Sequence, residues 1–356
     1  MTTSTIITST IMITRNNHER RGRPRKEADL KTDPIQRTEK TQKEIFCVFS
    51  LHFSSVHGII KRLDFRGKRM SRELEKYQLV EQSINKKFHK SLWRPFINAM
   101  KQYELVQAGD KIAACVSGGK DSFLNAKLLQ MLQRHSDVPF ELVFLMMDPG
   151  YNEENRRVIE ENAKLLNIPL TVFETDIFDV TASVGKSSSA CYLCARMRRG
   201  YLYSRAKELG CNKIALGHHL SDVIETTLMG MFYGSQLQAM QPKLHSKNFE
   251  GMTLIRPLYC VHEDDILAWC RYNDLHFIRC ACRFTQNCDS DEHSSKRKET
   301  KLLIKKLREE NPNIDRSIFN SIHAVHLDTF PGYKTDGEMH SFLEKFDRGE
   351  DGEENG

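Results

Sequence analysis

The segment KIAACVSGGKDS, residues 111–122, joins a short apolar run to a glycine-rich turn. The run 111–116 has the length and composition of a buried strand, and the stretch that follows, 121–135, has those of a helix. Two adjacent glycines let the backbone approach a ligand closely, and the free amides and dipole at a helix start favour a phosphate. The segment therefore predicts a phosphate-binding loop between a strand and a helix.

The polar residues of this loop narrow the chemistry. Lys120 adds a positive charge, and Ser117 and Ser122 add hydroxyl groups. Asp121 is an unfavourable neighbour for a phosphate unless a divalent cation bridges them, so it indicates Mg²⁺. The Walker A pattern needs four residues between its glycines and is absent. A glycine-rich turn capped by Asp121, without any ligand, is the structural alternative.

Outward from the loop, apolar runs of strand length alternate with helix-like stretches. The predicted strands are 111–116, 141–147, 170–173, 213–217 and 253–258. The predicted helices between them are 121–135, 152–167, 195–210 and 221–233. This alternation predicts an α/β fold, a Rossmann-like, doubly wound, parallel five-stranded sheet with helices on both faces. Ligands of such sheets bind beyond the carboxyl ends of the strands.

Helical additions are expected on both sides of this domain. Residues 70–108 have helical spacing with a division at Pro95, and residues 291–345 are expected to form C-terminal helices. The domain that carries the phosphate-binding loop and the cysteine cluster is predicted to span 109–290. Residues 346–356 form an acidic tail that we expect to be flexible. The chain is thus predicted to be one α/β domain with a helical segment at each end.

The net charge is unevenly distributed. The 356 residues contain 53 Lys and Arg against 47 Asp and Glu, a formal charge of +6. Residues 1–69 hold 15 basic and 7 acidic residues, which leaves 38 and 40 for residues 70–356. The leader is expected to be disordered and solvated, and translation from Met70 would omit it. The overall basicity is therefore no evidence for a nucleic-acid partner.

The sequence has neither a secretory signal nor a run of about 18 apolar residues that could cross a bilayer. A cytoplasmic protein without a disulfide framework is expected, although ten cysteines are present. Cys191 and Cys194 have a spacing that brings two thiolates onto one metal, and further ligands are available at Cys280, Cys282 and Cys288. From the residues alone, tetrahedral zinc and an iron–sulfur cluster both remain open.

Several motifs resemble a known family. SGGKDS, residues 117–122, resembles the PP-loop of the N-type ATP pyrophosphatases. GHHLSDVIET, residues 217–226, resembles their second signature, with Ser221 in place of an expected Asp. The stretches CYLCARMRRGYLYSRAKELGCNKIALGHH (191–219), MFYGSQLQAMQPKL (231–244) and IRPL (255–258) are similar to the tRNA 2-thiocytidine synthetase (TtcA) family. The resemblance covers about residues 85 to 285.

The resemblance implies a reaction and a set of site residues. ATP would adenylate a carbonyl oxygen of cytidine 32 in a tRNA anticodon loop, and sulfur carried on a [4Fe-4S] cluster would replace it. The implied catalytic residues are Asp121, Cys191, Cys194 and Cys280, with Asp121 placing Mg²⁺. The cluster would be held by Cys191, Cys194 and Cys280, with Cys282 as a competitor. The implied ATP-binding residues are Ser117, Gly118, Gly119, Lys120, Asp121, Ser122, Asp148, Gly217, His218 and Asp222.

The expected partners are tRNA and a sulfur donor such as a cysteine desulfurase, and a homodimer stays open. We expect tRNA to contact Arg196, Arg198 and Arg199, with residues 86–94 and 296–306 as other basic candidates. A solvated helix face is the simpler alternative for each of these patches. Three other functions are weighed: thiolation of a uridine, a ligase like tRNA-lysidine synthetase, and a non-catalytic metal- and nucleotide-containing RNA-binding protein.

Overall fold

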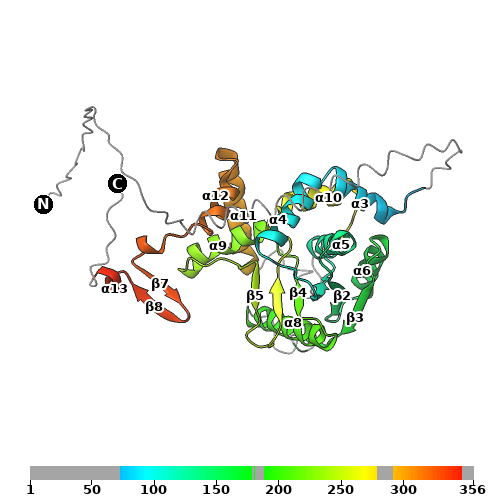
Figure 1. The fold of residues 1–356 in the computed structure, drawn as a ribbon, viewed down its shortest axis with the longest axis horizontal. Helices are drawn as coiled ribbons and strands as arrows, with labels where there is room; N and C mark the ends of the chain where they lie inside the picture. Colours follow the sequence, from blue (N-terminus) through cyan, green and yellow to red (C-terminus); the bar gives the residue numbers. More distant parts are fainter. Residues whose placement is uncertain (1–72, 179, 181–187, 279–291, 347–356) are drawn as a thin grey trace, which may run out of the picture. The chain divides into compact units, whose positions relative to one another are not determined.

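The computed structural model describes residues 73–178, 180, 188–278 and 292–346 (Figure 1). Its main sheet has six strands in the order β3-β2-β1-β4-β6-β5. The strands are β1 (Lys111–Cys115), β2 (Glu141–Asp148), β3 (Leu170–Glu174), β4 (Lys213–Ala215), β5 (Lys243–His245) and β6 (Thr253–Ile255). The five predicted parallel strands are confirmed, and the structure adds β5, which runs antiparallel to β6 at one edge.

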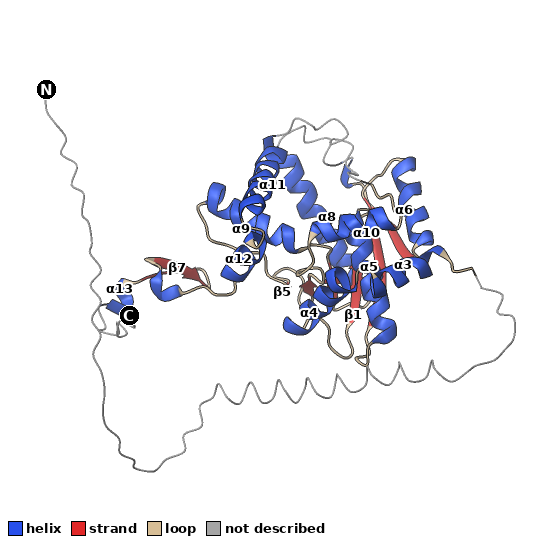
Figure 2. Ribbon diagram, turned by 90° about the horizontal axis from the view of Figure 1, so that it is seen from above, coloured by secondary structure: helices blue, strands red, loops and turns tan. Residues whose placement is uncertain are grey.

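Five helices accompany the strands: α5 (Lys120–His135), α6 (Glu153–Leu165), α8 (Ser188–Glu208), α9 (Leu220–Gly234) and α10 (Glu263–Tyr272). Successive residues of β1 point to opposite faces of the sheet. Ala113 packs with Tyr203 of α8 in one buried cluster, whereas Ala114 packs with Phe123 of α5 in another. The sheet is therefore covered on both faces, as doubly wound folds require. Helix α10 lies beside α5 in both views (Figures 1 and 2).

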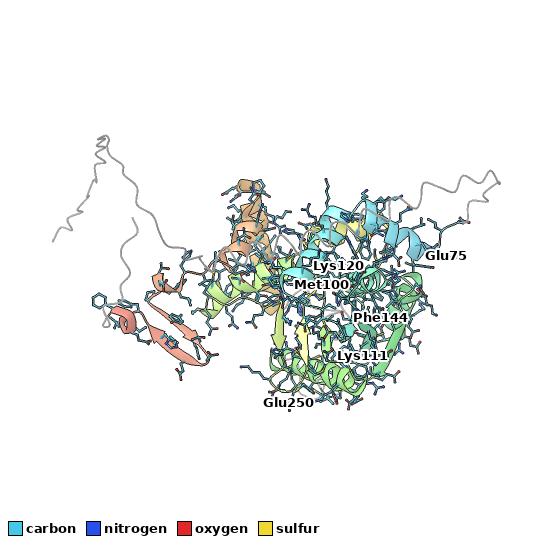
Figure 3. All side chains as sticks on the ribbon, in the orientation of Figure 1. Glu75, Met100, Lys111, Lys120, Phe144 and Glu250 are labelled. Atoms are coloured by element: carbon cyan, nitrogen blue, oxygen red, sulfur yellow. The ribbon has the colours of Figure 1, made fainter. Side chains whose placement is uncertain are left out.

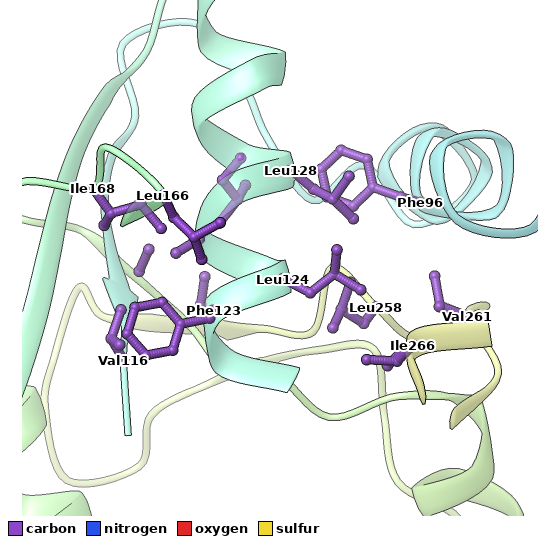
Figure 4. Packing of buried hydrophobic residues seen from close by; sticks show 14 of the residues in the cluster. Phe96, Val116, Phe123, Leu124, Leu128, Leu166, Ile168, Leu258, Val261 and Ile266 are labelled. Carbon is purple, nitrogen blue, oxygen red and sulfur yellow. The ribbon is translucent and has the colours of Figure 1, made fainter. Parts of the chain in front are cut away.

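Helix α5 is fixed by apolar contacts along its length (Figure 4). Phe123 lies beside Val116, while Leu124 points toward Leu258 and Ile266. All five side chains are at most 2% exposed. Complete burial of such a side chain contributes roughly 1.5–3 kcal/mol. Because Phe123 and Leu124 lie in the first turns of α5, this packing also holds the loop that precedes the helix.

The N-terminal segment comprises α3 (Lys76–Lys86), a π-helical turn η1 (His89–Trp93) and α4 (Arg94–Gln102). The predicted division at Pro95 is wrong in its position, because the chain turns at residues 87–88 and η1 continues into α4. Pro95 lies in the first turn of α4, where a missing backbone N–H costs nothing. The fully buried Lys127 of α5 pairs with Glu81 of α3 at 2.9 Å and joins the segment to the core.

Beyond α10 the described chain forms α11 (Glu292–Glu310), α12 (Ile314–Ser321), the 3₁₀ turn η3 (Leu327–Thr329), β7 (Gly332–Thr335), β8 (Glu338–Ser341) and α13 (Leu343–Phe346). Ile304 of α11 packs on Ile224 and Leu228 of α9. The expectation of helices throughout 291–345 is wrong for β7 and β8, which pair as an antiparallel hairpin. None of the described helices is long and apolar enough to span a membrane.

The leader, the acidic tail and the three cysteines Cys280, Cys282 and Cys288 lie outside the described residues.

Candidate functional site

The phosphate loop, residues 117–122, connects β1 to α5 at the carboxyl end of β1. Gly118 has φ +88°, a conformation that other residues rarely adopt. A Cβ atom there would lie 2.6 Å from Ile278 Cδ1 and 2.7 Å from Ile159 Cδ1. The Ser122 hydroxyl donates to the Gly119 carbonyl at 2.8 Å and accepts from the Ser117 amide at 3.1 Å. Ser122 thus closes the loop internally and fixes its shape.

The second signature touches this loop directly. Gly217 follows β4, and a Cβ atom there would lie 2.9 Å from the backbone carbonyl carbon of Asp121 and 3.0 Å from the Ser122 nitrogen. Only a glycine at position 217 lets the two segments meet without displacement. The two motifs, which lie about a hundred residues apart in the sequence, are therefore brought together, as predicted from the parallel sheet.

Asp121 offers a carboxylate oxygen for a cation. Its Oδ2 accepts from Lys120 Nζ at 3.1 Å, whereas its buried Oδ1 has no hydrogen-bond partner among the described residues. His219 Nε2 lies 3.7 Å from this Oδ1. Because His219 Nδ1 accepts from the Asp222 amide at 3.3 Å, the ring proton belongs on Nε2, facing Asp121. An unpartnered carboxylate oxygen beside a phosphate loop fits a Mg²⁺ ligand.

Lys120 is held between two carboxylates. Its Nζ lies 3.0 Å from Glu263 Oε1 at the start of α10 and 3.1 Å from Asp121 Oδ2. These ion pairs raise the pKa of Lys120 in spite of burial, and Lys120 with Lys301 lowers the pKa of Glu263 to about 2. Lys111 is the first residue of β1 and Lys120 follows its last residue, and Figure 3 shows the two lysines well apart. The loop cation is thus pre-positioned by a residue that sequence analysis did not identify.

A cavity of about 260 Å³, here called the loop cavity, opens at the carboxyl ends of β1, β2 and β4. Its lining includes Ser117, Gly119, Asp121, Ser122, Gly217, His218, Asp222 and Arg198. Burial and the positive charge of Arg256 lower the pKa of His218 to about 4, so its imidazole is neutral at pH 7. Seven of the ten predicted ATP-binding residues line one cavity, together with one arginine that was assigned to tRNA.

Asp148 has a different role in the structure. Its Oδ1 accepts from the amides of Gly150 and Tyr151 at 2.9 and 2.8 Å, and its Oδ2 accepts from Arg156 Nη1 at 2.5 Å. The Tyr151 hydroxyl in turn donates to the Ser117 carbonyl at 3.4 Å. Asp148 therefore builds the turn after β2 and connects it to the phosphate loop, and its side chain does not line the loop cavity.

The three predicted tRNA contacts separate in the structure. Arg198 lines the loop cavity, whereas Arg196 and Arg199 are exposed on α8. In the basic run 296–306, Arg297 pairs with Asp222 at 3.2 Å and with Glu225 at 2.7 Å, and Lys301 pairs with Glu263 at 3.0 Å. Part of this run is therefore neutralised by carboxylates and connects α11 to the site.

Cys191 and Cys194 both lie within α8, which starts at Ser188 and not after the cysteines as predicted. Residues three and four apart share one face of a helix, so Cys191, Cys194 and Arg198 follow a single face. Cys194 is half-buried and packs against the main core. Ile278, at the last described position before residue 279, contacts the region of Gly118. Among the described residues no three metal-ligating side chains cluster.

Comparison with known proteins agrees with this geometry. A model of the PP-loop domain family matches residues 81–285. A curated tRNA-cytidine(32) 2-sulfurtransferase from Citrifermentans bemidjiense is 36% identical over 230 residues, which are 64% of this chain and 88% of that protein. One from Vibrio parahaemolyticus is 34% identical over 261 residues, 72% of this chain and 83% of that protein. The chain belongs to the tRNA-cytidine(32) 2-sulfurtransferase family of PP-loop proteins.

A solved structure has a fold similar to that of this member of the 2-sulfurtransferase family. The U34-tRNA thiolase NcsA from Methanococcus maripaludis, solved with its [4Fe-4S] cluster, has a TM-score of 0.52 and 21% identity, covering 70% of this chain and 83% of that one. At this identity the likeness supports the PP-loop fold. The predicted family and fold class are thus both confirmed.

Sequence reasoning assigned no role to His219 and Glu263 of this site, or to Arg256, which lines a different cavity. His219 had a signal, since it adjoins His218 within the second signature. Glu263 had none, because an acidic residue in the first turn of a helix is common for reasons of helix dipole alone. Arg256 lies in the quoted IRPL stretch but carries no local pattern that distinguishes a buried arginine.

Proposed function

We propose that the chain is an ATP-dependent tRNA sulfurtransferase that thiolates C2 of cytidine 32 through an adenylated base. One observation supports this most strongly: Cys194 and Arg198 are one turn apart on α8, and Arg198 lines the loop cavity together with Asp121. A cysteine of the CxxC pair proposed to carry sulfur is thus one helical turn from a wall residue of the proposed ATP site. Family membership and the PP-loop geometry are consistent with this assignment.

In this proposal the residues of the loop bind ATP and assist departure of pyrophosphate. The amides at the start of α5 and the Lys120 ammonium neutralise the phosphate oxygens as the bond between the α and β phosphates breaks. Asp121 Oδ1 holds Mg²⁺, and His219 keeps the Asp121 carboxylate oriented. The neutral imidazole of His218 contributes no charge at pH 7, so it acts as a hydrogen-bonding wall of the cavity.

A [4Fe-4S] cluster held by Cys191, Cys194 and Cys280 would supply sulfide for the adenylated carbon. Two described residues are consistent with such a ligand set, since Cys194 lies on α8 one turn before Arg198 and Ile278 lies beside Gly118 of the loop.

The remaining parts of the proposal concern partners. We propose tRNA as the substrate, a cysteine desulfurase as the sulfur donor, and a reducing cytoplasm as the place of reaction. Thiolation of another tRNA base is the second candidate function and would use the same residues. It is suggested by the structural relative NcsA, which is named a U34-tRNA thiolase. A lysidine-type ligase would have no use for the cysteines of α8.

Two measurements test this proposal. Anaerobic purification followed by iron, zinc and sulfide analysis should give about four iron atoms per chain for a [4Fe-4S] cluster. Cys194→Ser should lose the iron, whereas the matched control Cys260→Ala, at a half-buried cysteine beside Tyr103, should keep it. A colourless protein with one bound zinc would contradict the cluster.

Mass spectrometry of tRNA nucleosides identifies the base. A deletion strain should lack 2-thiocytidine and regain it with the wild-type gene, but not with Asp121→Asn. Loss of a thiouridine instead would establish the second candidate, and an unchanged nucleoside profile would contradict a role in tRNA thiolation.

A further inference from the structure

A second cavity lies next to the loop cavity. It has a volume of about 820 Å³ and is here called the α9 cavity. The end of α9, the segment 238–241 and the residue after β6 form its wall. Its lining residues are Thr226, Met229, Gly230, Tyr233, Gly234, Gln238, Ala239, Met240, Gln241, Leu244 and Arg256. Among the described residues, none of those predicted to bind ATP or metal lines it.

The two cavities adjoin along one sheet edge. Strands β4 and β6 pair in parallel with Ala215 opposite Ile255, and the Leu216 amide donates to the Ile255 carbonyl at 3.0 Å. Leu216, the first residue after β4, lines the loop cavity. Arg256, the first residue after β6, lines the α9 cavity. The two cavities thus take wall residues from the ends of neighbouring strands, and the charge of Arg256 acts on His218 of the loop cavity.

Arg256 gives the α9 cavity a cation without a counterion. Its side chain donates to the Gln241 carbonyl, but its buried Nε has no hydrogen-bond partner, and no carboxylate pairs with it among the described residues. The residue is 9% exposed. Burial lowers the pKa of Arg256 to about 10, which leaves it protonated at pH 7. A buried, unpaired guanidinium is costly unless an acceptor oxygen from a ligand reaches it.

One aromatic side chain of the cavity wall is open to solvent. Tyr233 lines the cavity and is 45% exposed, and Met231, Phe232 and Leu237, which are 48–53% exposed, add apolar surface near the end of α9. Lys296 Nζ lies 5.1 Å from the centre of the Tyr233 ring, and the Tyr233 hydroxyl donates to Glu299 at 3.0 Å, so charges of both signs lie near this ring. Aromatic and apolar side chains stack splayed-out bases, and arginine recognises their carbonyl or phosphate oxygens.

We propose that the α9 cavity receives an unstacked nucleotide of the substrate RNA, the target cytidine itself, with Arg256 donating to one of its oxygen atoms. The inference rests on the proposed function for the identity of the nucleotide. It places the base against the end of α9, beside the loop cavity, where its reacting oxygen would have to meet the α-phosphate of ATP.

The test is a comparison of RNA affinities, measured by fluorescence anisotropy with the full chain. The probes are an anticodon stem-loop RNA with cytidine at position 32 and the same RNA with an abasic nucleotide at that position. The wild type should bind the intact RNA roughly tenfold more tightly than the abasic one, the usual size of a lost stacking contact. Arg256→Met and Ala239→Phe, which remove the cation and fill the cavity, should abolish this difference.

Three controls make the result decisive. Arg157→Met removes an exposed arginine of α6 and should retain the tenfold preference. ATP affinity of both variants should stay within twofold of wild type, and thermal melting should show that they fold. Should R256M unfold, A239F alone decides, because Ala239 is a half-buried wall residue.

The outcomes separate this inference from the proposed function. If the two cavity variants keep the preference for the intact RNA, the inference is overturned. It is also overturned if the variants lose ATP affinity as well as RNA preference, because the cavity would then be assigned to ATP. A wild type that prefers intact RNA but adds no sulfur upholds the cavity and contradicts the proposed function. A wild type that thiolates tRNA without base-dependent affinity refutes the cavity alone.

Discussion

Lys120 Nζ lies 3.0 Å from Glu263 Oε1, so the cation of the phosphate loop shares its charge with the first residue of α10. Both side chains are little exposed, at 23% and 22%. Glu263→Gln keeps the shape and removes the competing charge. We expect ATP to bind about fivefold more tightly, equivalent to ~1 kcal/mol for a partly screened pair. Isothermal titration with ATP and Mg²⁺ measures it.

The matched control for that change is Asp264→Asn on the same turn of α10. Its carboxylate pairs with Arg308 at 3.1 Å and is 74% exposed, and it does not touch Lys120. Equal tightening in both variants would show a general charge effect and would contradict a specific role of Glu263.

Gly217→Ala tests the contact between the two signatures. The added methyl group would lie 2.9 Å from the Asp121 carbonyl carbon, which is backbone and cannot rotate away. We expect a destabilisation of roughly 1–3 kcal/mol, as in overpacked interiors, and at least tenfold weaker ATP binding. Gly200→Ala in α8 is the control, because a methyl group there meets nothing within 4 Å. The control should be neutral or slightly stabilising in urea unfolding.

His218 predicts a pH dependence of stability. Its pKa is lowered from 6.5 to about 4 in the folded chain by burial first and by Arg256 second. As pH falls from 6.5 to 4, the unfolded chain takes up a proton that the folded chain refuses, so stability is lost in that window. The loss is at most about 3 kcal/mol. His218→Gln should lack it.

The measurement for His218 is the difference in unfolding free energy between wild type and H218Q at pH 4 to 8. The difference should be constant above pH 7. Below pH 6.5 the unfolding free energy of the wild type should fall relative to that of H218Q. A difference that stays constant down to pH 4 would show that the imidazole is freely protonated.

Arg198 should behave differently from Arg196 and Arg199. It lines the loop cavity, whereas the other two are exposed on α8. Arg198→Met should weaken ATP binding roughly tenfold, because a charge-assisted contact to a phosphate is lost. The double variant Arg196→Met and Arg199→Met should leave ATP binding unchanged and weaken RNA binding in a salt-dependent way. Titrations with each ligand separate the two. Equal ATP affinities in all variants would remove Arg198 from the nucleotide site.

The parts of the fold that sequence predicts are those with strong local patterns. The five parallel strands are runs of apolar residues that end in turns, and each was placed within a few residues. Strand β5 was missed because KLH, residues 243–245, is short and lies at an edge. The β7–β8 hairpin had a signal that was overlooked, Asp336-Gly337, whose φ values of +51° and +93° suit a tight hairpin turn.

The residues of the site also divide into those that local sequence predicts and those that it does not. The loop and Gly217 are predictable because backbone geometry demands their residue types. Glu263 and Arg256 are not, because each acts through partners distant in sequence, Lys120 in one case and a cavity wall in the other. Asp148 shows the opposite limit. A polar residue at a strand end suggested a ligand contact, but its oxygens accept from the amides of its own turn and from Arg156 of α6.

The arrangement of the two cavities has a consequence for how such proteins diversify. The loop cavity is built by β1, β2, β4, α8 and the first turns of α5 and α9, whereas the α9 cavity is built by the end of α9, residues 238–241 and Arg256. Substitutions in 226–244 therefore change the wall of the α9 cavity and leave the lining residues of the loop cavity as they are. On the proposed roles of the two cavities, a single catalytic frame would acquire a new target nucleotide through changes in one short stretch of chain.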